Sequence, residues 1–343
     1  MTTTGRPVRI TDVAALAGVS PGTVSKALNN TGALRDSTRA RVREAADRLG
    51  FVPDPDARWL SARRSYTVGL LSADSAGRFS IPVMLGAESA LAAGRMAALL
   101  ATSRRDPVRE VFLVESMLAR RVDGLIVTGR TTDPRPPVDL GGSDIPVVYA
   151  FSPSTDPDDA SVFPDDAHGA RLVVEHLLAT GRRRIVHVGG RPHQHSSTER
   201  AEAAQRALAD AGLGLAAPTL FGEWSEAWGR QAVDVLLRTR DLADPDADLG
   251  FDAIMCGSDQ IARGACDRLR ELGVAVPERV AVTGFDDWDV MALASRPPLT
   301  TVDLRLEELG RRAAELLLDA IAGRPHHGRE LMPMRLVPRA STG

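Results

Sequence analysis

The stretch ITDVAALAGVSPGTVSKALN, residues Ile10–Asn29, decides the fold of the first part of the chain. Apolar residues recur at helical spacing on both sides of a short break, which predicts one helix over 10–17 and another over 21–28. Gly18 can adopt the left-handed conformation that ends a helix, and Ser20 can cap the helix that follows. We therefore expect two short helices joined by a tight turn.

The flanking residues predict the rest of this domain. A third helix starting near Ser37 would place Val42 and Leu49 on one stripe and several arginines outside it. In the first helix we expect Thr11 to be the cap and Leu16 to lie on the buried face. Three short helices with a glycine-containing turn are typical of a helix-turn-helix, but a generic three-helix bundle with a solvated arginine face has the same spacing.

The outer face of the second helix favours DNA binding. It carries short hydrogen-bonding groups and one cation, and no carboxylate that would repel phosphate: Pro21, Gly22, Thr23, Ser25, Lys26 and Asn29. Over these twenty positions the sequence resembles the N-terminal signature of the LacI/GalR family of bacterial transcriptional repressors. The resemblance implies two groups of contacts: to the major groove from Pro21, Gly22, Ser25 and Lys26, and to phosphates from Ser20, Thr23 and Asn29.

Residues 53–65 follow as a hinge. Asp54 as a cap, followed by a proline, predicts a short helix, although the composition alone suits a proline-rich linker. So short a helix needs a partner to be stable. The segment resembles the LacI/GalR hinge helix, which pairs with its dimer mate on DNA. The resemblance implies that Leu60 wedges into the minor groove and that Ala57 and Arg58 precede it there.

Charge is divided unevenly along the 343 residues. Residues 1–65 hold eleven basic and six acidic side chains, whereas the rest of the chain holds 31 and 39. A basic head on an acidic body predicts a module that binds a polyanion, attached to a body that avoids one. The sequence shows neither a signal peptide nor an apolar run long enough to span a membrane, so we expect a cytoplasmic protein.

Residue usage argues against most catalytic chemistry. The single lysine, Lys26, leaves the body without a phosphate-binding or Schiff-base lysine, and neither a Gly-x-Ser-x-Gly elbow nor a His-Glu-x-x-His pair occurs. Cys256 and Cys266 are expected to be buried thiols. We expect no metal and no cofactor, because two histidine pairs lack further ligands and suit exposed loops better: His193 with His195, and His326 with His327.

From Tyr66 onward, short apolar runs alternate with helical stretches. This pattern predicts an α/β body with parallel sheets covered on both faces and ligands at the carboxyl ends of the strands. The expected strands are Thr67–Leu71, Met96–Thr102, Gly124–Thr128, Pro146–Ala150, Ile185–Gly189, Thr219–Gly222, Ala253–Cys256 and Val280–Gly284. The family resemblance continues through Arg121–Ile126, Asp165–Ala170, Val280–Asp287 and Pro298–Val302, and implies a periplasmic-binding-protein-like core of two subdomains.

These observations define the expected domains. The helix-turn-helix domain covers 1–52, the hinge 53–65, and the effector-binding and dimerisation core 66–343. Within the core, the expected N-subdomain is 66–180 plus 303–328, and the expected C-subdomain is 181–302 plus 329–343.

Polar and aromatic residues near predicted strand ends form the candidate effector site. Two carboxylates, a guanidinium and an indole suit a polyhydroxylated ring: Asp259, Asp286, Arg200 and Trp224. The resemblance places these four at the ligand, and Phe79 matches an aromatic that often lines the cleft. The alternatives are helix caps for the carboxylates, a solvated residue at a helix start for the arginine, and core packing for the two aromatics.

The combined pattern predicts a repressor, dimeric or larger, that binds a palindromic operator and is controlled by a small-molecule effector, with a sugar as the leading candidate. A purine- or nucleoside-responsive regulator or a co-repressor-dependent one is the alternative within this class. A sugar-binding protein and an enzyme on the same core are alternatives from other classes. The missing signal peptide argues against transport, and the missing catalytic motifs argue against an enzyme.

Overall fold

The computed structural model describes residues 8–28, 32–51, 64–74, 77–240, 244 and 247–343. The chain forms two units, which we call the head, Met1–Ser65, and the body, Tyr66–Gly343. The division falls at the end of the expected hinge.

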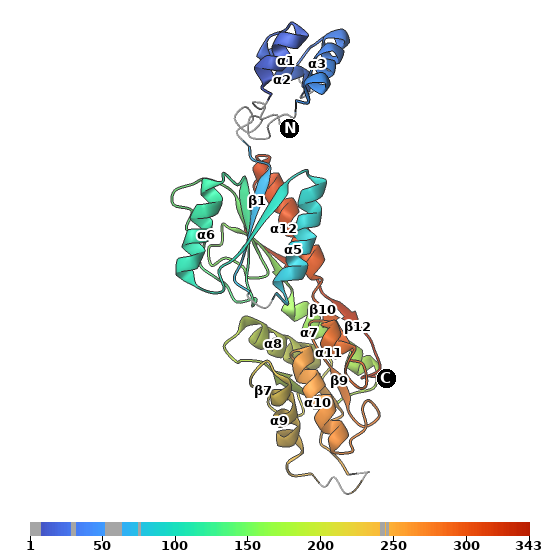
Figure 1. The fold of residues 1–343 in the computed structure, drawn as a ribbon. Coiled ribbons are helices and arrows are strands. Elements are labelled where there is room, and N and C mark those ends of the chain that lie inside the picture. Colours follow the sequence, from blue (N-terminus) through green and yellow to red (C-terminus); the bar gives the residue numbers. More distant parts are fainter. Residues whose placement is uncertain (1–7, 29–31, 52–63, 75–76, 241–243, 245–246) are drawn as a thin grey trace, which may run out of the picture. The chain divides into compact units, whose positions relative to one another are not determined.

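Three helices make up the described head (Figure 1), as the sequence predicts. They are α1 (Ile10–Ala17), α2 (Pro21–Leu28) and α3 (Asp36–Leu49). Gly18 ends α1 at a φ of 64°, and the Ser20 hydroxyl accepts a hydrogen bond from the Thr23 backbone N–H at 3.2 Å. The turn between α1 and α2 thus has the geometry that a left-handed glycine and a serine cap produce.

Two local predictions for α1 are wrong. The N-cap is Arg9 rather than Thr11, because the Arg9 backbone N–H donates to the Asp12 carboxylate at 2.8 Å and the helix starts one residue before Thr11. Leu16 is 46% exposed, because smaller residues form the stripe of α1 that meets the other two helices. The core of the head consists of Val13, Ala14, Ala17, Val24, Ala27, Val42, Ala45 and Ala46.

Most of the predicted hinge lies outside the described residues. Ala57, Arg58 and Leu60 belong to that part of the chain, and so does Asn29 of the head. Their assignment to DNA contacts stays a prediction from the sequence.

The body has two lobes, each built on its own parallel sheet, which confirms the predicted α/β class. In the first lobe the strand order is β11-β5-β4-β3-β1-β2. The strands are β1 (Thr67–Ser72), β2 (Ala97–Thr102), β3 (Gly124–Thr128), β4 (Val147–Ala150), β5 (Ala160–Pro164) and β11 (Arg329–Met332). One face of the sheet is covered by α5 (Ser80–Ala93) and α12 (Leu306–Ile321), and the other by α6 (Pro107–Ala119) (Figure 1).

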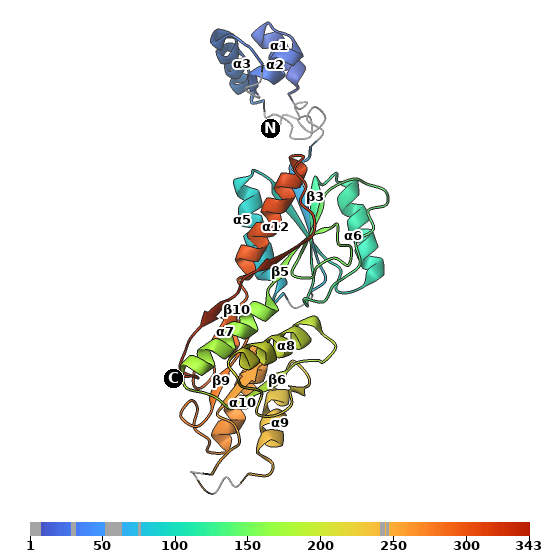
Figure 2. The ribbon, with the colours of Figure 1, turned by 180° about the vertical axis from the view of Figure 1, so that it is seen from behind.

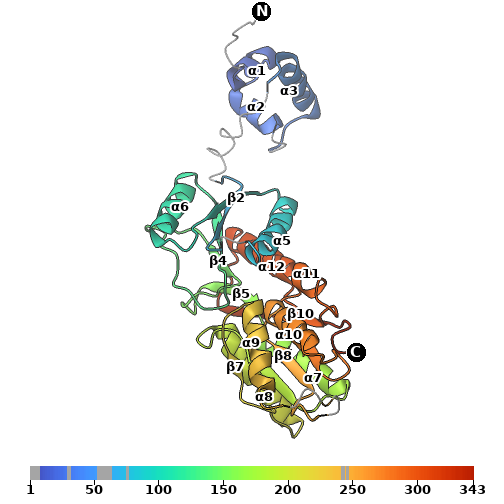
Figure 3. The ribbon, with the colours of Figure 1, turned by 60° about the horizontal axis from the view of Figure 1, so that its bottom comes forward.

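In the second lobe the strand order is β7-β6-β8-β9. The strands are β6 (Ile185–Gly189), β7 (Leu220–Phe221), β8 (Ala253–Cys256) and β9 (Ala281–Thr283). One face is covered by α7 (Asp166–Ala179) and α8 (His195–Asp210) (Figure 2), and the other by α9 (Glu226–Leu237) and α10 (Asp259–Glu271), which lie side by side (Figure 3). A short helix, α11 (Asp289–Ala292), follows β9. Cys256 and Cys266 are buried free thiols, as expected.

Two antiparallel strands, β10 (Thr301–Asp303) and β12 (Arg335–Val337), connect the lobes. The sequence places residues 66–180 in the first lobe, but α7 packs on α8 in the second, because Asp165 caps α7 directly after β5 and turns the chain there. The sequence also places 329–343 in the second lobe, whereas β11 pairs with β5 of the first sheet. No helix of the described chain is long and apolar enough to cross a membrane.

Glycines let paired helices approach closely in both lobes. A Cβ on Gly86 of α5 would lie 1.8 Å from the Glu307 carbonyl oxygen at the start of α12. In the second lobe a Cβ on Gly264 of α10 would lie 2.0 Å from the Glu226 carbonyl oxygen of α9, and Gly229 of α9 makes the reciprocal approach to α10. The helix separation on one face of each sheet therefore depends on residues without side chains.

We expect Gly264→Ala to destabilise the body by about 1–3 kcal/mol, because the methyl group forces α9 and α10 apart and overpacks their interface. Gly214→Ala is the matched control, since no atom lies within 4 Å of a Cβ built at that position. Urea denaturation of the two variants measures the difference in the free energy of unfolding. Equal stability of the two variants would contradict the close helix contact.

Candidate functional site

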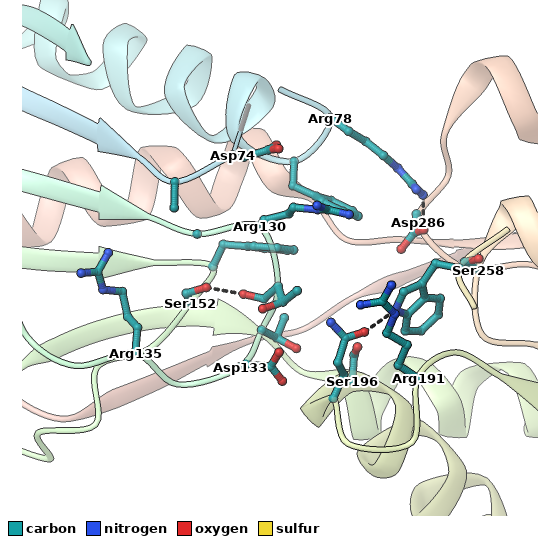
Figure 4. Close-up of a pocket in the computed structure, with 18 of the residues that line it drawn as sticks. Asp74, Arg78, Arg130, Asp133, Arg135, Ser152, Arg191, Ser196, Ser258 and Asp286 are labelled. Carbon is teal, nitrogen blue, oxygen red and sulfur yellow. Dashed lines mark hydrogen bonds and ion pairs between the residues drawn. The ribbon is translucent and has the colours of Figure 1, made fainter. Parts of the chain in front are cut away.

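A cavity of about 770 Å³ lies between the two lobes of the body (Figure 4). Its walls come from residues that follow the carboxyl ends of strands in both sheets, which is where parallel α/β folds place ligands. Four of the five predicted effector residues line it: Phe79, Arg200, Trp224 and Asp286. The fifth, Asp259, lies behind the wall.

Asp286 presents a carboxylate to the cavity from the loop after β9. Its side chain is 6% exposed, and its backbone φ of 110° is one that residues other than glycine rarely adopt. Arg78 of the first lobe forms an ion pair with it, and Arg200 lies 4.0 Å away. Burial raises the pKa of Asp286, and the two guanidinium groups oppose that shift. A buried acceptor of this kind suits a ligand that donates hydrogen bonds.

Arg200 lies within α8 rather than at the start of that helix. The residue is 4% exposed; its Nε donates to the Asp166 carboxylate at 2.7 Å and its Nη1 to the Gly257 carbonyl at 2.6 Å. Its guanidinium carbon lies 3.7 Å from the centroid of the Phe285 ring. The alternative that Arg200 is a solvated helix residue is therefore wrong. Most of its N–H donors already have partners within the protein.

Asp166 is a site residue that sequence reasoning missed. It is 2% exposed at the first position of α7, and besides Arg200 it accepts a hydrogen bond from the Thr132 hydroxyl of the first lobe at 3.2 Å. The contact joins the two lobes directly behind Thr132 and Arg200, which line the cavity. The sequence signal that points to it is the pair of consecutive acidic residues, Asp165 and Asp166, directly after β5.

Asp259 is fully buried at the first position of α10. Its carboxylate accepts hydrogen bonds from the Thr301 hydroxyl at 2.5 Å and from the Trp288 backbone N–H at 2.7 Å. Burial and the neighbouring Asp286 raise its pKa to about 8. Asp259 thus positions the loop that carries the site residues instead of facing the cavity, and Ser258 is the cap of α10.

Aromatic side chains enter the cavity from both lobes. Phe79 and Phe151 stack in the first lobe, with ring centroids 5.0 Å apart and planes inclined by 21°. In the second lobe Trp224 lies against Gly190, where a Cβ would be 2.2 Å from the indole, and its Nε1 donates to the Gln194 side chain. Phe79 and Trp224 each pack against a cluster of buried apolar side chains, and both also line the cavity.

The cavity holds further cations that the sequence reading did not assign. Arg130 follows β3 and extends into the cavity (Figure 4), and Arg105 lies at its edge. Within the described chain neither guanidinium has a hydrogen-bond or ion-pair partner. Both can therefore donate to acceptor groups of a ligand.

His187 is a buried base on β6. It is 0% exposed, and neither ring nitrogen has a hydrogen-bond partner among the described residues. Burial, and to a smaller extent the Arg200 guanidinium, lower its pKa to about 4. The ring is therefore neutral in the folded protein at neutral pH.

We expect the free energy of unfolding of His187→Leu to fall less than that of the wild type as the pH is lowered below 6.5. The folded-state pKa of about 4 is lower than the ordinary value of 6.5, so the unfolded chain binds an extra proton between these pH values and wild-type stability falls as pH is lowered through them. The full effect is about 3 kcal/mol. Denaturation at about pH 7 and about pH 4.5 measures it, and an identical change in both proteins would contradict a neutral buried ring.

The predicted DNA-contacting residues of the head lie on one side of α2. Pro21, Gly22 and Lys26 are exposed, and Thr23 and Ser25 are partly exposed, whereas Val24 and Ala27 of the same helix are buried. The Ser20 hydroxyl at the start of α2 lies 2.9 Å from that of Thr23. The helix therefore presents the short polar face that the sequence predicts.

The histidines do not gather into a metal site in the described chain. No group of three or more His, Cys, Asp or Glu residues there could hold a metal ion. His193, His326 and His327 are exposed, as expected, whereas His195 is partly buried as the first residue of α8.

Comparison with known proteins accounts for both units. Residues 9–54 match the model of bacterial regulatory proteins of the lacI family, and residues 174–342 match a periplasmic binding protein-like domain. The HTH-type transcriptional regulator CelR of Thermobifida fusca is 33% identical over 333 residues, which cover 95% of this chain and 94% of that protein. The chain belongs to the LacI family.

Further relatives support the same assignment. The HTH-type transcriptional repressor PurR of Aliivibrio fischeri (strain MJ11) is 29% identical, with 97% of each chain covered. A crystal structure of the Lac repressor dimer bound to operator and the anti-inducer ONPF matches this LacI-family chain with a TM-score of 0.75 and 26% identity, covering 98% of this chain and 99% of that one. The structure of a CelR–cellobiose complex matches with a TM-score of 0.65 and 30% identity over 98% and 100% of the two chains. The protein is a DNA-binding transcriptional regulator.

Proposed function

We propose that this LacI-family protein is a homodimeric repressor that binds a palindromic operator and releases or holds it according to a sugar bound between the lobes of the body. The observation that carries the proposal is the cavity, which combines a buried carboxylate, Asp286, with aromatic faces from both lobes. A ligand there touches both lobes, so its binding energy can shift the balance between two lobe arrangements.

The chemistry of the walls supports a sugar as the effector. Hydroxyl groups can donate to Asp286 and accept from Arg130, while the C–H faces of a ring can lie on Phe79 and Trp224. The cavity volume falls within the range of about 300–1,000 Å³ common for small-molecule sites. The complex of a CelR protein with cellobiose, a structure 30% identical to this chain, supports the same class of ligand.

A purine base is the second candidate. The slot between Phe79 and Trp288 holds a planar group, the Arg78 guanidinium, whose carbon is 4.7 Å and 4.3 Å from the two ring centroids. A planar base with N–H donors toward Asp286 would use the same two faces.

Exposed apolar side chains on the first lobe support a homodimer. On the edge strand β2 and the adjacent helix α6, Leu100 is 61% exposed, Val108 79% and Phe112 65%. A second copy of this chain can bury them across a two-fold axis, and two heads related in this way read a palindromic operator. A regulator of this kind acts where the chromosome lies, in the cytoplasm, and needs neither a catalytic group nor a cofactor.

We expect the effector, found in a thermal-shift screen of neutral sugars and purine bases, to stabilise the wild-type protein but not Asp286→Asn. A ligand at a hundred times its dissociation constant adds about 2.7 kcal/mol of stability, and the amide removes the anionic acceptor. Asp248→Asn is the matched control, because its carboxylate pairs with Arg184 and does not line the cavity. Operator binding without ligand should remain in both variants. A normal ligand response of Asp286→Asn would remove that residue from the site.

We expect Lys26→Ala to lower the discrimination between operator and random DNA by about 1–3 kcal/mol, because lysine can donate to a guanine edge in the major groove. Arg41→Ala, on the exposed side of α3, is the control and should change both affinities equally. Fluorescence-anisotropy titrations at one fixed salt concentration measure the two constants. Equal weakening on both DNAs by Lys26→Ala would refute the base contact.

A further inference from the structure

Arg78 crosses the cavity from one lobe to the other. It lies just before α5 in the first lobe, and its side chain is 17% exposed. Its guanidinium forms an ion pair with Asp286 (Figure 4). It also donates to the Gln260 side chain at 3.1 Å, and both partners belong to the second lobe. The side chain therefore joins two surfaces that a ligand between the lobes has to contact.

The same guanidinium fills an aromatic slot. It lies between Phe79 of the first lobe and Trp288 of the second, in the arrangement of a cation over two ring faces. Its Nε is buried and has no hydrogen-bond partner among the described residues. Because an unpaired buried donor costs free energy, this arrangement is held less firmly than that of Arg200, whose Nε donates to Asp166.

We propose that Arg78 is an internal occupant of the effector site, which the effector has to displace in order to take over the contacts that Arg78 makes with Asp286 and with the rings of Phe79 and Trp288. This inference rests on the proposed function, because it takes the cavity as the effector site. It assigns Arg78 as a residue that sets the affinity and selectivity of binding, rather than as a ligand contact.

Competition follows from the chemistry of Asp286. Two cations compensate its buried carboxylate, and Arg78 makes a closer contact with it than Arg200, which lies 4.0 Å away. An incoming ligand can replace that contact only by donating hydrogen bonds from several groups in one plane or ring. Ligands with fewer hydrogen-bond donors leave Arg78 in place. The arginine therefore raises the effector concentration needed to occupy the cavity and excludes ligands with few donors.

Displacement also has a mechanical consequence. When Arg78 leaves Asp286, a direct ion pair between the lobes is broken, and the ligand takes over the connection. The two lobes can then settle in an arrangement that the ligand favours, which is the requirement for a ligand to change DNA affinity.

The test uses the full-length protein with Arg78→Ala and a matched control, Arg312→Ala. Arg312 also forms an ion pair, with Nε and Nη2 at 2.8 Å and 3.0 Å from Glu330, but both residues belong to the first lobe and lie away from the cavity. Arg78→Lys is a second variant, which keeps a cation but loses the planar stack and the fork of donors. The probes are methylguanidinium, which has the shape of the missing side chain, and cellobiose.

We expect methylguanidinium to bind Arg78→Ala saturably, with a change in tryptophan fluorescence, and not to bind the wild type or Arg312→Ala. In calorimetry we expect Arg78→Ala to bind cellobiose about tenfold more tightly than the wild type does. The affinity of Arg312→Ala for cellobiose should lie within about twofold of the wild-type value. The affinity of Arg78→Lys should lie between those of the wild type and Arg78→Ala. Absence of saturable methylguanidinium binding to Arg78→Ala would overturn the internal occupant.

Weaker cellobiose binding by Arg78→Ala than by the wild type would also overturn it, because Arg78 would then be a ligand contact. The methylguanidinium measurement needs no sugar. If no variant bound cellobiose, that result would exclude cellobiose as the effector, and the occupancy of the slot by Arg78 would still be decided by methylguanidinium. The two failures are thus distinguishable.

Discussion

Buried charge beside the cavity is the constraint on which the arrangement of the second lobe depends. The side chains of Asp166, Arg200 and Asp286 are 1%, 5% and 6% exposed, and a buried charge that loses its partner costs several kcal/mol. The three residues come from the start of α7, the interior of α8 and the loop after β9. These elements satisfy one another because α7 packs on α8 and the loop after β9 lies against both. The packing of the second lobe and the pairing of the buried charges therefore depend on each other.

The two lobes are suited to move as separate bodies around this site. In each lobe a pair of helices is locked at close range by glycines, Gly86 in the first and Gly264 in the second, so that bending within a lobe would disturb tightly packed backbone. Between the lobes the chain runs through the two-stranded connector of β10 and β12, and polar contacts such as Thr132 with Asp166 join the cavity walls. Polar contacts can be exchanged for contacts with a ligand, whereas the glycine contacts cannot. A ligand signal is thus expected to change lobe arrangement and to leave the lobes intact.

The parts that could be predicted from sequence depend on local or periodic signals. The left-handed Gly18, the Ser20 cap and the short polar face with Lys26 act over a few residues, and the alternation of apolar runs and helices predicts parallel sheets without any knowledge of their order. The site residues at strand ends, Asp286 and Trp224, follow from the same rule.

The remaining features depend on contacts between distant parts of the chain. β11 becomes a strand because β5 supplies its partner from far away in the sequence. Asp259 and Asp286 look alike as acidic residues after strands, yet one is buried behind the wall and the other faces the cavity, because the 284–288 loop folds over Asp259. Arg78 gave no periodic or motif signal, and its role appears only when the second lobe is placed opposite it.

The proposed function requires that binding of a ligand in this cavity and binding of the operator by the head are linked. Because linkage is reciprocal, the most direct measurement determines two affinities of the full-length protein. The first is the affinity for operator, with and without a saturating concentration of the ligand that stabilises the protein most. The second is the affinity for that ligand, with and without operator. Linkage predicts that both affinities change, and by the same factor. A ligand that occupies the cavity with the same affinity whether or not operator is bound would contradict it.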